Sequence, residues 1–169
     1  MIESYIAIEG PIGVGKTSLA EIIADKLNTR KVLEKFKDNP FLEGFYDDPD
    51  ANAFQTQVFF LLQRYQQQQK EIRQLNALQK GVVTDYMFEK DRLFASFTLK
   101  SQAEDELYGH VADILEKDVV KPDLVVYLQA DTSRLMKNIK KRGREFEKDV
   151  TFDYIDVVNQ KYQEFFVNY

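Results

Sequence analysis

Short apolar segments alternate along the chain with longer segments in which apolar residues recur every three or four positions. The short segments are continuous and rich in β-branched residues, which predicts buried strands at residues 4–9, 31–33, 81–85 and 124–128. The longer segments predict helices that begin at Lys16 and that span 51–80, 87–98, 103–117, 131–142 and 151–166. Strands that alternate with helices are typical of an α/β domain with a parallel sheet.

The longest predicted helix, residues 51–80, exceeds the width of a small domain. It would be about 45 Å long at about 1.5 Å per residue, so we expect part of its apolar stripe to contact a partner. Its run of glutamines, Gln66 to Gln69, predicts a solvent-facing stretch made of good helix formers. The segment before it, residues 36–49, is rich in turn-forming residues and predicts an irregular connection.

The composition is that of a soluble globular protein. The chain has 169 residues, 44% of them apolar and 30% charged, and we treat residues 1–169 as one domain. Its net charge of −5 argues against a protein that binds a nucleic acid polymer. The chain has no cysteine and a single histidine, His110, which excludes thiolate and multi-histidine metal sites. No apolar run approaches the ~20 residues of a membrane span, and the first residues do not resemble a signal peptide, so we expect a cytoplasmic protein.

Residues 10–17, GPIGVGKT, fit the phosphate-loop pattern G-x-x-x-x-G-K-[ST] between a predicted strand and a predicted helix. The glycines let backbone N–H groups turn toward one point, and the start of the helix adds the positive end of its dipole. Lys16 supplies a charge to the terminal phosphates, and the Thr17 hydroxyl is an oxygen ligand suited to Mg²⁺. The predicted site for ATP, or another nucleoside triphosphate, with Mg²⁺ comprises Gly10, Pro11, Ile12, Gly13, Val14, Gly15, Lys16, Thr17 and Ser18. The loop alone does not separate a kinase from a hydrolase or a switch protein.

Five segments in order along the chain resemble the deoxynucleoside kinase family, and its bacterial branch most closely. They read IEGPIGVGKTSLA, LEKFKDNPFLEGFYDDP, FQTQVFFLLQRY, TDYMFEKDRLFA and PDLVVYLQADTSRLMKNIKKRGRE. The resemblance covers residues 5–166 and implies a three-layer phosphate-loop kinase fold. It also implies transfer of the γ-phosphate of ATP, or another triphosphate, to the 5′-hydroxyl of a deoxynucleoside in nucleotide salvage.

The resemblance assigns acceptor-binding roles to residues at four positions. Glu34 matches the carboxylate that ends the second strand and accepts the 5′-hydroxyl proton, and a modest base suffices for a loose phosphoryl transition state. Tyr46 matches the tyrosine near the sugar 3′-hydroxyl, and Glu147 matches the carboxylate that shares this hydroxyl. Gln55 matches the glutamine whose amide reads the base edge, a task that suits a group with both donors and an acceptor.

Arg142 and Arg144 match the arginines of the family's lid, which we place at residues 142–150. A planar guanidinium binds phosphate oxygens through two N–H groups and neutralises charge that develops during transfer. Phe54 and Phe88 are candidate walls for the base, although apolar residues at helical spacing are more often part of a core. The resemblance further implies a homodimer built on helices 51–80 and 103–117.

The segment after the third predicted strand departs from the family pattern. The family has an acidic residue, an arginine and a serine there, whereas this chain has Asp85, Tyr86 and Met87. Asp85 retains the acid, which can hold Mg²⁺ near Thr17, but the arginine is absent. The family's base-contacting acid aligns with Lys90 or with Asp91, and Lys90 or Arg92 could replace the missing charge.

The end of the chain is a second departure, because the family continues into a fifth strand and this sequence supplies four. The chain could be truncated or naturally short, and in either case the fourth strand would present an unpaired edge. Two other functions compete with the kinase assignment. A nucleoside monophosphate kinase, such as a thymidylate kinase, shares the phosphate loop and the arginine-bearing lid, and a non-catalytic nucleotide-binding regulator would tolerate the missing arginine.

Overall fold

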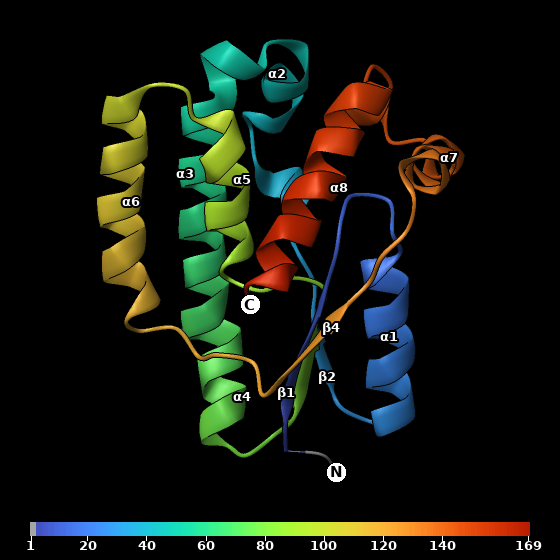
Figure 1. Ribbon diagram of the computed structural model, residues 1–169. Coiled ribbons are helices and arrows are strands. Elements are labelled where there is room, and N and C mark those ends of the chain that lie inside the picture. Colours follow the sequence, from blue (N-terminus) through green and yellow to red (C-terminus); the bar gives the residue numbers. More distant parts are fainter. Residues whose placement is uncertain (1–2) are drawn as a thin grey trace.

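A computed structural model describes residues 3–169 and contains a parallel four-stranded sheet (Figure 1). The strands are β1 (Tyr5–Glu9), β2 (Arg30–Val32), β3 (Val82–Thr84) and β4 (Leu124–Tyr127), in the order β2-β3-β1-β4. Ala7 of the central strand β1 lies opposite Thr84 of β3 and Val125 of β4. The α/β fold with a parallel sheet that the sequence predicts is therefore confirmed.

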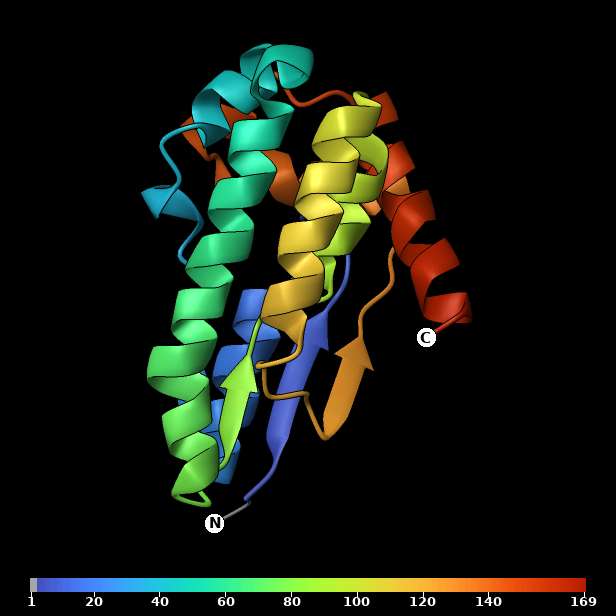
Figure 2. The same cartoon turned by 90° about the vertical axis from the view of Figure 1, so that its left-hand side faces the viewer.

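Side chains that alternate along β1 divide the core into two layers. Ile6 and Ile8 face α1 (Lys16–Leu27), which covers this side of the sheet with Ala20 and other small or aliphatic residues. Tyr5 and Ala7 face the opposite side, where Ile72, α4 (Arg73–Ala77) and the end of α8 (Phe152–Val167) pack against the sheet. Figures 1 and 2 show the sheet between these two layers of helices. The sheet and the helices on its two sides form the three-layer arrangement that the resemblance implies.

The other helices connect and cover the carboxyl ends of the strands (Figure 2). Gly143 follows α7 (Thr132–Arg142) in the left-handed conformation, with φ of 63°, and so ends the helix where the sequence predicts. Asp131 caps the start of α7 by accepting a hydrogen bond of 2.7 Å from the Arg134 backbone N–H. The remaining helices are α2 (Leu42–Asp47), α3 (Pro49–Gln67), α5 (Lys90–Thr98) and α6 (Gln102–Glu116).

The prediction of one regular helix over residues 51–80 is wrong. A π-helical turn, Gln68–Ile72, separates α3 from α4. Its hydrogen bonds span five residues instead of four, which rotates the face that the following residues present to the sheet. This shift turns Ile72 into the core, where its side chain is fully buried. Gln67 and Gln68 are also buried, so the glutamine run does not form a solvent-facing stretch.

The connection 36–49 is more regular than the sequence predicts. It contains a short 3₁₀ turn, Phe36–Asp38, followed by α2. The turn-forming residues that suggested a loop lie mainly at the ends of these elements, and Asn39 accepts a hydrogen bond of 3.0 Å from the Phe41 backbone N–H. Helix α2 brings aromatic side chains over the carboxyl ends of the strands.

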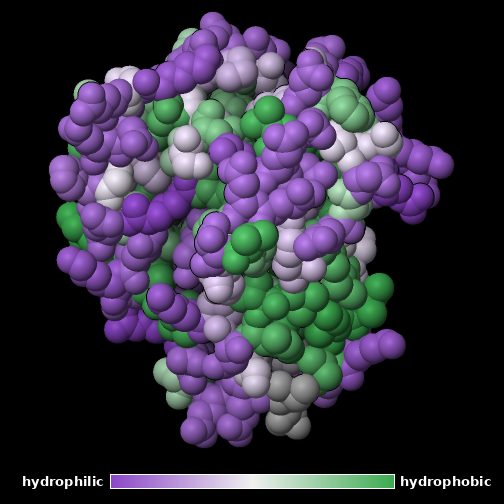
Figure 3. Space-filling model, in the orientation of Figure 1, coloured by the Kyte–Doolittle hydropathy of each residue, from purple (hydrophilic) through white to green (hydrophobic). Residues whose placement is uncertain are grey.

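Exposed apolar side chains gather where β4 and α1 lie. Figure 3 shows this hydrophobic area on the face seen in Figure 1. Leu124 of β4 and Ile22 of α1 are 53% and 52% exposed, as expected beside a strand that pairs on one side only.

Among the helices formed by residues 3–169, none has the length and apolar character needed to cross a membrane.

Candidate active site

A cavity of about 540 Å³ opens at the carboxyl ends of the strands, where ligands bind in open α/β sheets. Helices α1, α2 and α3 and the segment after α7 surround it. Most residues that the sequence singles out line this cavity: Ile12, Gly13, Gly15, Lys16, Thr17, Ser18, Glu34, Tyr46, Asp85, Lys90, Arg142, Arg144 and Glu147. Gly10, Pro11, Val14, Gln55 and Asp91 do not line it.

The phosphate loop requires glycine at two points of close approach. A Cβ atom on Gly10 would lie 2.5 Å from the Leu128 carbonyl oxygen, and one on Gly13 would lie 2.8 Å from the Leu135 carbonyl oxygen. Both residues have positive φ, at 149° and 85°. Gly15, also at positive φ, precedes α1, and no side chain caps the first N–H groups of the helix. These N–H groups therefore remain available to an anion.

Lys16 is held against the phosphate loop by its own backbone. Its Nζ donates to the carbonyl oxygens of Gly10 at 2.6 Å and Pro11 at 3.2 Å. Burial, and then the positive charge of Lys90, lower the pKa of Lys16 to about 8. The ammonium group is thus positioned for terminal phosphates but is easier to deprotonate than an exposed lysine.

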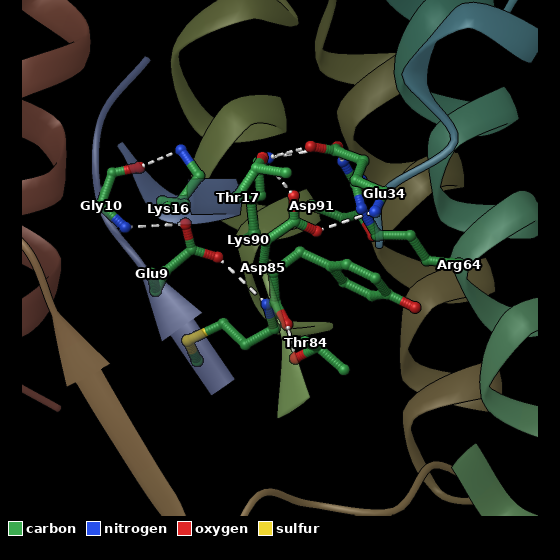
Figure 4. A network of polar contacts seen from close by, with 12 residues as sticks. Glu9, Gly10, Lys16, Thr17, Glu34, Arg64, Thr84, Asp85, Lys90 and Asp91 are labelled. Carbon is green, nitrogen blue, oxygen red and sulfur yellow. Dashed lines mark hydrogen bonds and ion pairs between the residues drawn. The ribbon is translucent and has the colours of Figure 1, made fainter. Parts of the chain in front are cut away.

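Asp85 joins the phosphate loop to the end of β2. Its Oδ2 accepts from the Thr17 hydroxyl at 2.6 Å, and its Oδ1 accepts from the Glu34 backbone N–H at 2.7 Å (Figure 4). The hydroxyl and the carboxylate are the hard oxygen donors that Mg²⁺ prefers. Within residues 3–169, no group of three histidine, cysteine or acidic side chains could hold a metal alone. The donor set fits a Mg²⁺ ion that also takes ligands from a bound nucleotide.

Glu34 is bound by two cations on the acceptor side of the cavity. Lys90 Nζ lies 2.9 Å from Oε2 and 3.1 Å from Oε1 of Glu34, and the Arg64 guanidinium also forms an ion pair with this carboxylate. Burial raises the pKa of Glu34, but the charges of Lys90 and Arg64 outweigh it and hold that pKa well below its usual range. Glu34 is therefore ionised at neutral pH.

Arg64 is a site residue that the sequence analysis missed. Its guanidinium lies 4.8 Å from the centre of the Phe60 ring and forms ion pairs with Glu34 and with Asp91. The Asp91 side chain is 1% exposed and lies behind Arg64, outside the cavity. Asp91 therefore holds Arg64 rather than facing a ligand, which separates its role from that of Lys90.

Gln55 does not take the position that the sequence analysis gives it. Gln55 is exposed, whereas Gln57 is buried and lines the cavity. The candidate base walls also differ, since Phe54 and Phe88 pack in the core formed by α3, α5 and α6. The aromatic rings that line the cavity are those of Phe36, Phe45, Phe60, Phe94, Phe146, Tyr46 and Tyr154.

Tyr46 and Glu147 lie near one another at the lid, as the resemblance implies. The Tyr46 ring stacks on Phe146 with 5.9 Å between ring centres. Burial, with smaller contributions from Tyr154 and Glu147, raises the pKa of Tyr46 well above its usual value, so its hydroxyl remains a hydrogen-bond donor. Glu147 is buried and accepts from Arg142 Nε at 2.8 Å.

Arg142 and Arg144, which the resemblance assigns to a lid, both contact Glu147. Arg144 Nη1 lies 3.5 Å from Glu147 Oε1, and its guanidinium lies 3.9 Å from the centre of the Phe36 ring. Two cations therefore converge on a carboxylate at the edge of the cavity. Lys141 and Asn138 of α7 also line the cavity, and Asn138 Nδ2 donates to the Gly13 carbonyl oxygen of the phosphate loop at 2.8 Å.

Lys90, and not Arg92, is the cation that the β3–α5 segment brings to the site. Arg92 points to α6, where its Nη2 lies 3.0 Å from Glu116 Oε2 and also pairs with Asp113. The side chain of Lys90 is 8% exposed and lines the cavity. His110 is exposed on α6, in keeping with the absence of any predicted role.

Comparison with known proteins agrees with this geometry. A sequence model of the family described as deoxynucleoside kinase matches residues 6–169. The chain is 38% identical to a deoxyguanosine kinase of Bacillus subtilis (strain 168), with 94% of this chain and 76% of the relative covered. It is 35% identical to a deoxyadenosine kinase of Dictyostelium discoideum, with 96% and 66% covered. A structure of deoxyadenosine kinase from M. mycoides with bound dATP superimposes with a TM-score of 0.85 at 26% identity, with 97% and 84% covered.

The family match, the identity to these kinases and the shared fold lead to one assignment. Lysine, threonine and glycine residues of the phosphate loop face a carboxylate across a single cavity, as phosphoryl transfer requires. The chain belongs to the deoxynucleoside kinase family, the enzymes that transfer a phosphoryl group from a nucleoside triphosphate to a deoxynucleoside.

Proposed function

We propose that this kinase phosphorylates the 5′-hydroxyl of a purine deoxynucleoside with ATP as donor. The observation that carries the proposal is the Asp85 bridge between Thr17 and the Glu34 backbone. It fixes the acceptor carboxylate beside the donor loop, within one cavity. The relatives at 38% and 35% identity are a deoxyguanosine kinase and a deoxyadenosine kinase, which supports a purine base.

Glu34 is the group that receives the 5′-hydroxyl proton. Its carboxylate is ionised, and Lys90 and Arg64 hold it in one orientation. In a loose transition state the hydroxyl proton leaves late, so a weak but well-placed base serves the reaction. Lys90 also places a cation beside Glu34, where the charge of the transferred phosphoryl group develops. We assign to Lys90 the role of the arginine that the segment after β3 lacks.

Magnesium belongs to this proposal as a ligand of the donor nucleotide. The Thr17 hydroxyl and the Asp85 carboxylate are the residues that would hold it, directly or through water. The ion would neutralise charge on the phosphates. Lys16, Arg142 and Arg144 supply the remaining positive charge from the protein, from opposite sides of the cavity.

The sugar and the base fit the remaining surface of the cavity. Tyr46 and Glu147 offer a donor and an acceptor to the 3′-hydroxyl, at the end where Phe146 stacks on Tyr46. The polar residues of α3 that line the cavity are Thr56, Gln57 and Arg64, and we assign Gln57 and the Arg64 guanidinium to the base edge. A bidentate amide beside a guanidinium suits the mixed donors and acceptors of a purine.

An uncharged acceptor fits better than a nucleoside monophosphate. On the acceptor side the two carboxylates, Glu34 and Glu147, already form ion pairs with the cations around them. A 5′-phosphate would have to displace these ion pairs and approach Glu34, and like charges in a buried site oppose such an approach. This arrangement disfavours the monophosphate kinase alternative.

The enzyme assembles as a homodimer of single-domain chains and acts in the cytoplasm, where its nucleoside triphosphate donor is available. Helices α3 and α6 lie side by side in Figure 2 and carry exposed apolar residues, including Leu62, Leu107 and Ile114. These residues support an interface along the two helices, as the family resemblance implies.

A direct assay tests the acceptor class. The purified chain is incubated with ATP and Mg²⁺ and with each deoxynucleoside or its 5′-monophosphate, and the products are separated. We expect monophosphates of deoxyguanosine or deoxyadenosine, and loss of both activities in Lys16→Ala. Diphosphates formed from monophosphates, with nucleosides unchanged, would instead identify a monophosphate kinase. Equal rates with pyrimidine deoxynucleosides would contradict the purine assignment alone.

A further inference from the structure

Glu9 is a buried carboxylate next to the site that none of the roles above uses. It is the last residue of β1 and is 1% exposed. Its Oε1 accepts from the Gly10 backbone N–H at 2.9 Å and from the Tyr162 hydroxyl at 3.0 Å, and its Oε2 accepts from the Met87 backbone N–H at 3.0 Å. Figure 4 shows Glu9 beneath the phosphate loop, with its carboxylate turned toward Gly10.

The three donors come from three separate segments. Gly10 begins the phosphate loop, Met87 lies between β3 and α5, and Tyr162 belongs to α8. Burial, and then the charge of Glu9, raise the pKa of Tyr162 well above its usual value, so the phenol stays a donor. A buried carboxylate is costly unless hydrogen bonds replace its water, and these neutral donors supply three of them.

Two of these donors connect directly to groups that act on the substrates. Gly10 donates its N–H to Glu9, while its carbonyl oxygen accepts from Lys16 Nζ at 2.6 Å. Met87 lies between Asp85, which binds Thr17 and the Glu34 backbone, and Lys90, which binds the Glu34 carboxylate. One carboxylate thus links the donor loop to the segment that carries the acceptor-side groups.

We propose that Glu9 is a positioning residue that sets the distance between the phosphate loop and the Asp85–Lys90 segment. The inference rests on the proposed function, because it takes Lys16 and Glu34 as the two halves of the reaction. A carboxylate is required because both of its oxygens accept hydrogen bonds from backbone N–H groups. An amide of the same size would turn an NH₂ group toward one of these N–H donors and would release either the loop or the segment.

The test compares Glu9→Gln with Tyr162→Phe in the full chain. Tyr162→Phe removes the phenol and leaves both backbone N–H groups bound to Glu9, so it controls for the loss of one buried hydrogen bond. A misplacement of about 1 Å can lower a rate about 100-fold, so we expect kcat of Glu9→Gln to fall about 10- to 100-fold. The acceptor KM should change less than about twofold, because Tyr46, Gln57 and Glu147, which we assign to the sugar and the base, lie on other segments of the chain. Tyr162→Phe should keep most of kcat.

Thermal unfolding of each variant separates positioning from loss of fold. Glu9→Asp keeps both carboxylate oxygens on a side chain that is one methylene shorter, so we expect its kcat to lie between those of the wild type and Glu9→Gln. If Glu9→Gln does not fold, the kcat of Glu9→Asp tests the inference. The inference is overturned if the folded Glu9→Gln or Glu9→Asp retains wild-type kcat, or if Glu9→Gln and Tyr162→Phe lose kcat equally. A wild-type chain without kinase activity would overturn the proposed function first, and this inference with it.

Discussion

The Lys90 ammonium lies 2.9 Å from the Glu34 carboxylate, so the base that we propose is bound to a cation before any substrate enters. Together with Arg64, Lys90 lowers the pKa of Glu34 well below its usual range despite burial. A carboxylate this acidic is a weak base. The rate must therefore depend on how well it is placed against the 5′-hydroxyl, as expected for a loose transition state.

Glu34→Gln should lower kcat about 100-fold or more, because the amide keeps the size of the side chain and cannot accept the proton. The KM of the deoxynucleoside should change much less, since the hydroxyl can still form a hydrogen bond to the amide. Steady-state kinetics with ATP and Mg²⁺ measures both values. Glu71→Gln is a matched control, because Glu71 pairs with Lys35 on the exposed side of the same region. A raised KM with kcat unchanged would assign Glu34 to substrate binding instead.

The pH dependence of donor use should report on Lys16. Its pKa is about 8 in the free protein, because burial and the charge of Lys90 lower it. As pH rises through about 8, Lys16 loses its proton and its charge, so kcat/KM for ATP should fall on the alkaline side with a midpoint near this value.

The pH profile of kcat at saturating ATP is compared with the profile of kcat/KM. Bound phosphates favour charged Lys16 and raise its pKa, so kcat should remain constant to a higher pH than kcat/KM does. The two profiles are measured between about pH 6 and about pH 10. A kcat/KM profile for ATP that stays flat beyond about pH 9.5 would show that Lys16 does not titrate in the free enzyme.

Gln57 and Gln55 form a natural pair of variants for the base site. Gln57 is buried and lines the cavity, whereas Gln55 is exposed on the same helix. Gln57→Leu should raise the KM of the preferred deoxynucleoside by about 10-fold or more, because hydrogen bonds to the base edge are lost and their partners are left unpaired. Gln55→Leu should leave KM unchanged. The reverse result would return the base-reading role to Gln55.

The error between these two glutamines shows what the sequence could not supply. Residues in a helix are about 100° apart around its axis, so a shift of two positions moves a side chain by about 200° to the opposite face. The apolar pattern of α3 predicts a helix, but the helix also buries polar residues, Gln57 and Arg64 among them, which an apolar pattern does not mark. Arg64 lies seven residues after Gln57, about two turns, and so reaches the same face. The resemblance gave the base-edge role to Gln55 and no role to Arg64, so both residues of this face were missed.

The phosphate loop and the ends of the strands could be predicted because their geometry is local or follows from the sheet. The carboxyl ends of parallel strands meet at one edge, which brings Thr17, Glu34 and Asp85 within hydrogen-bonding distance. The ion pair between Arg64 and Asp91 is different, since it depends on how α3 packs against α5. The π-helical turn after α3 likewise follows from burial of Ile72 against the sheet, which propensity alone does not report.

Substitution on α6 should separate the homodimer that we propose into monomers. Leu107 and Ile114 are 54% and 67% exposed and lie seven residues apart, about two turns, on one stripe of the helix. In a symmetric dimer each substitution occurs twice around the axis, so Leu107→Glu with Ile114→Glu would bring four carboxylates into one apolar interface. Sedimentation at micromolar concentration should give twice 19.8 kDa for the wild type and 19.8 kDa for the double variant. Ile22→Glu is the matched control, since Ile22 is 52% exposed on α1, away from α3 and α6, and should leave the dimer intact. A wild-type chain that sediments as a monomer would contradict the dimer, and a double variant that stays dimeric would place the interface elsewhere.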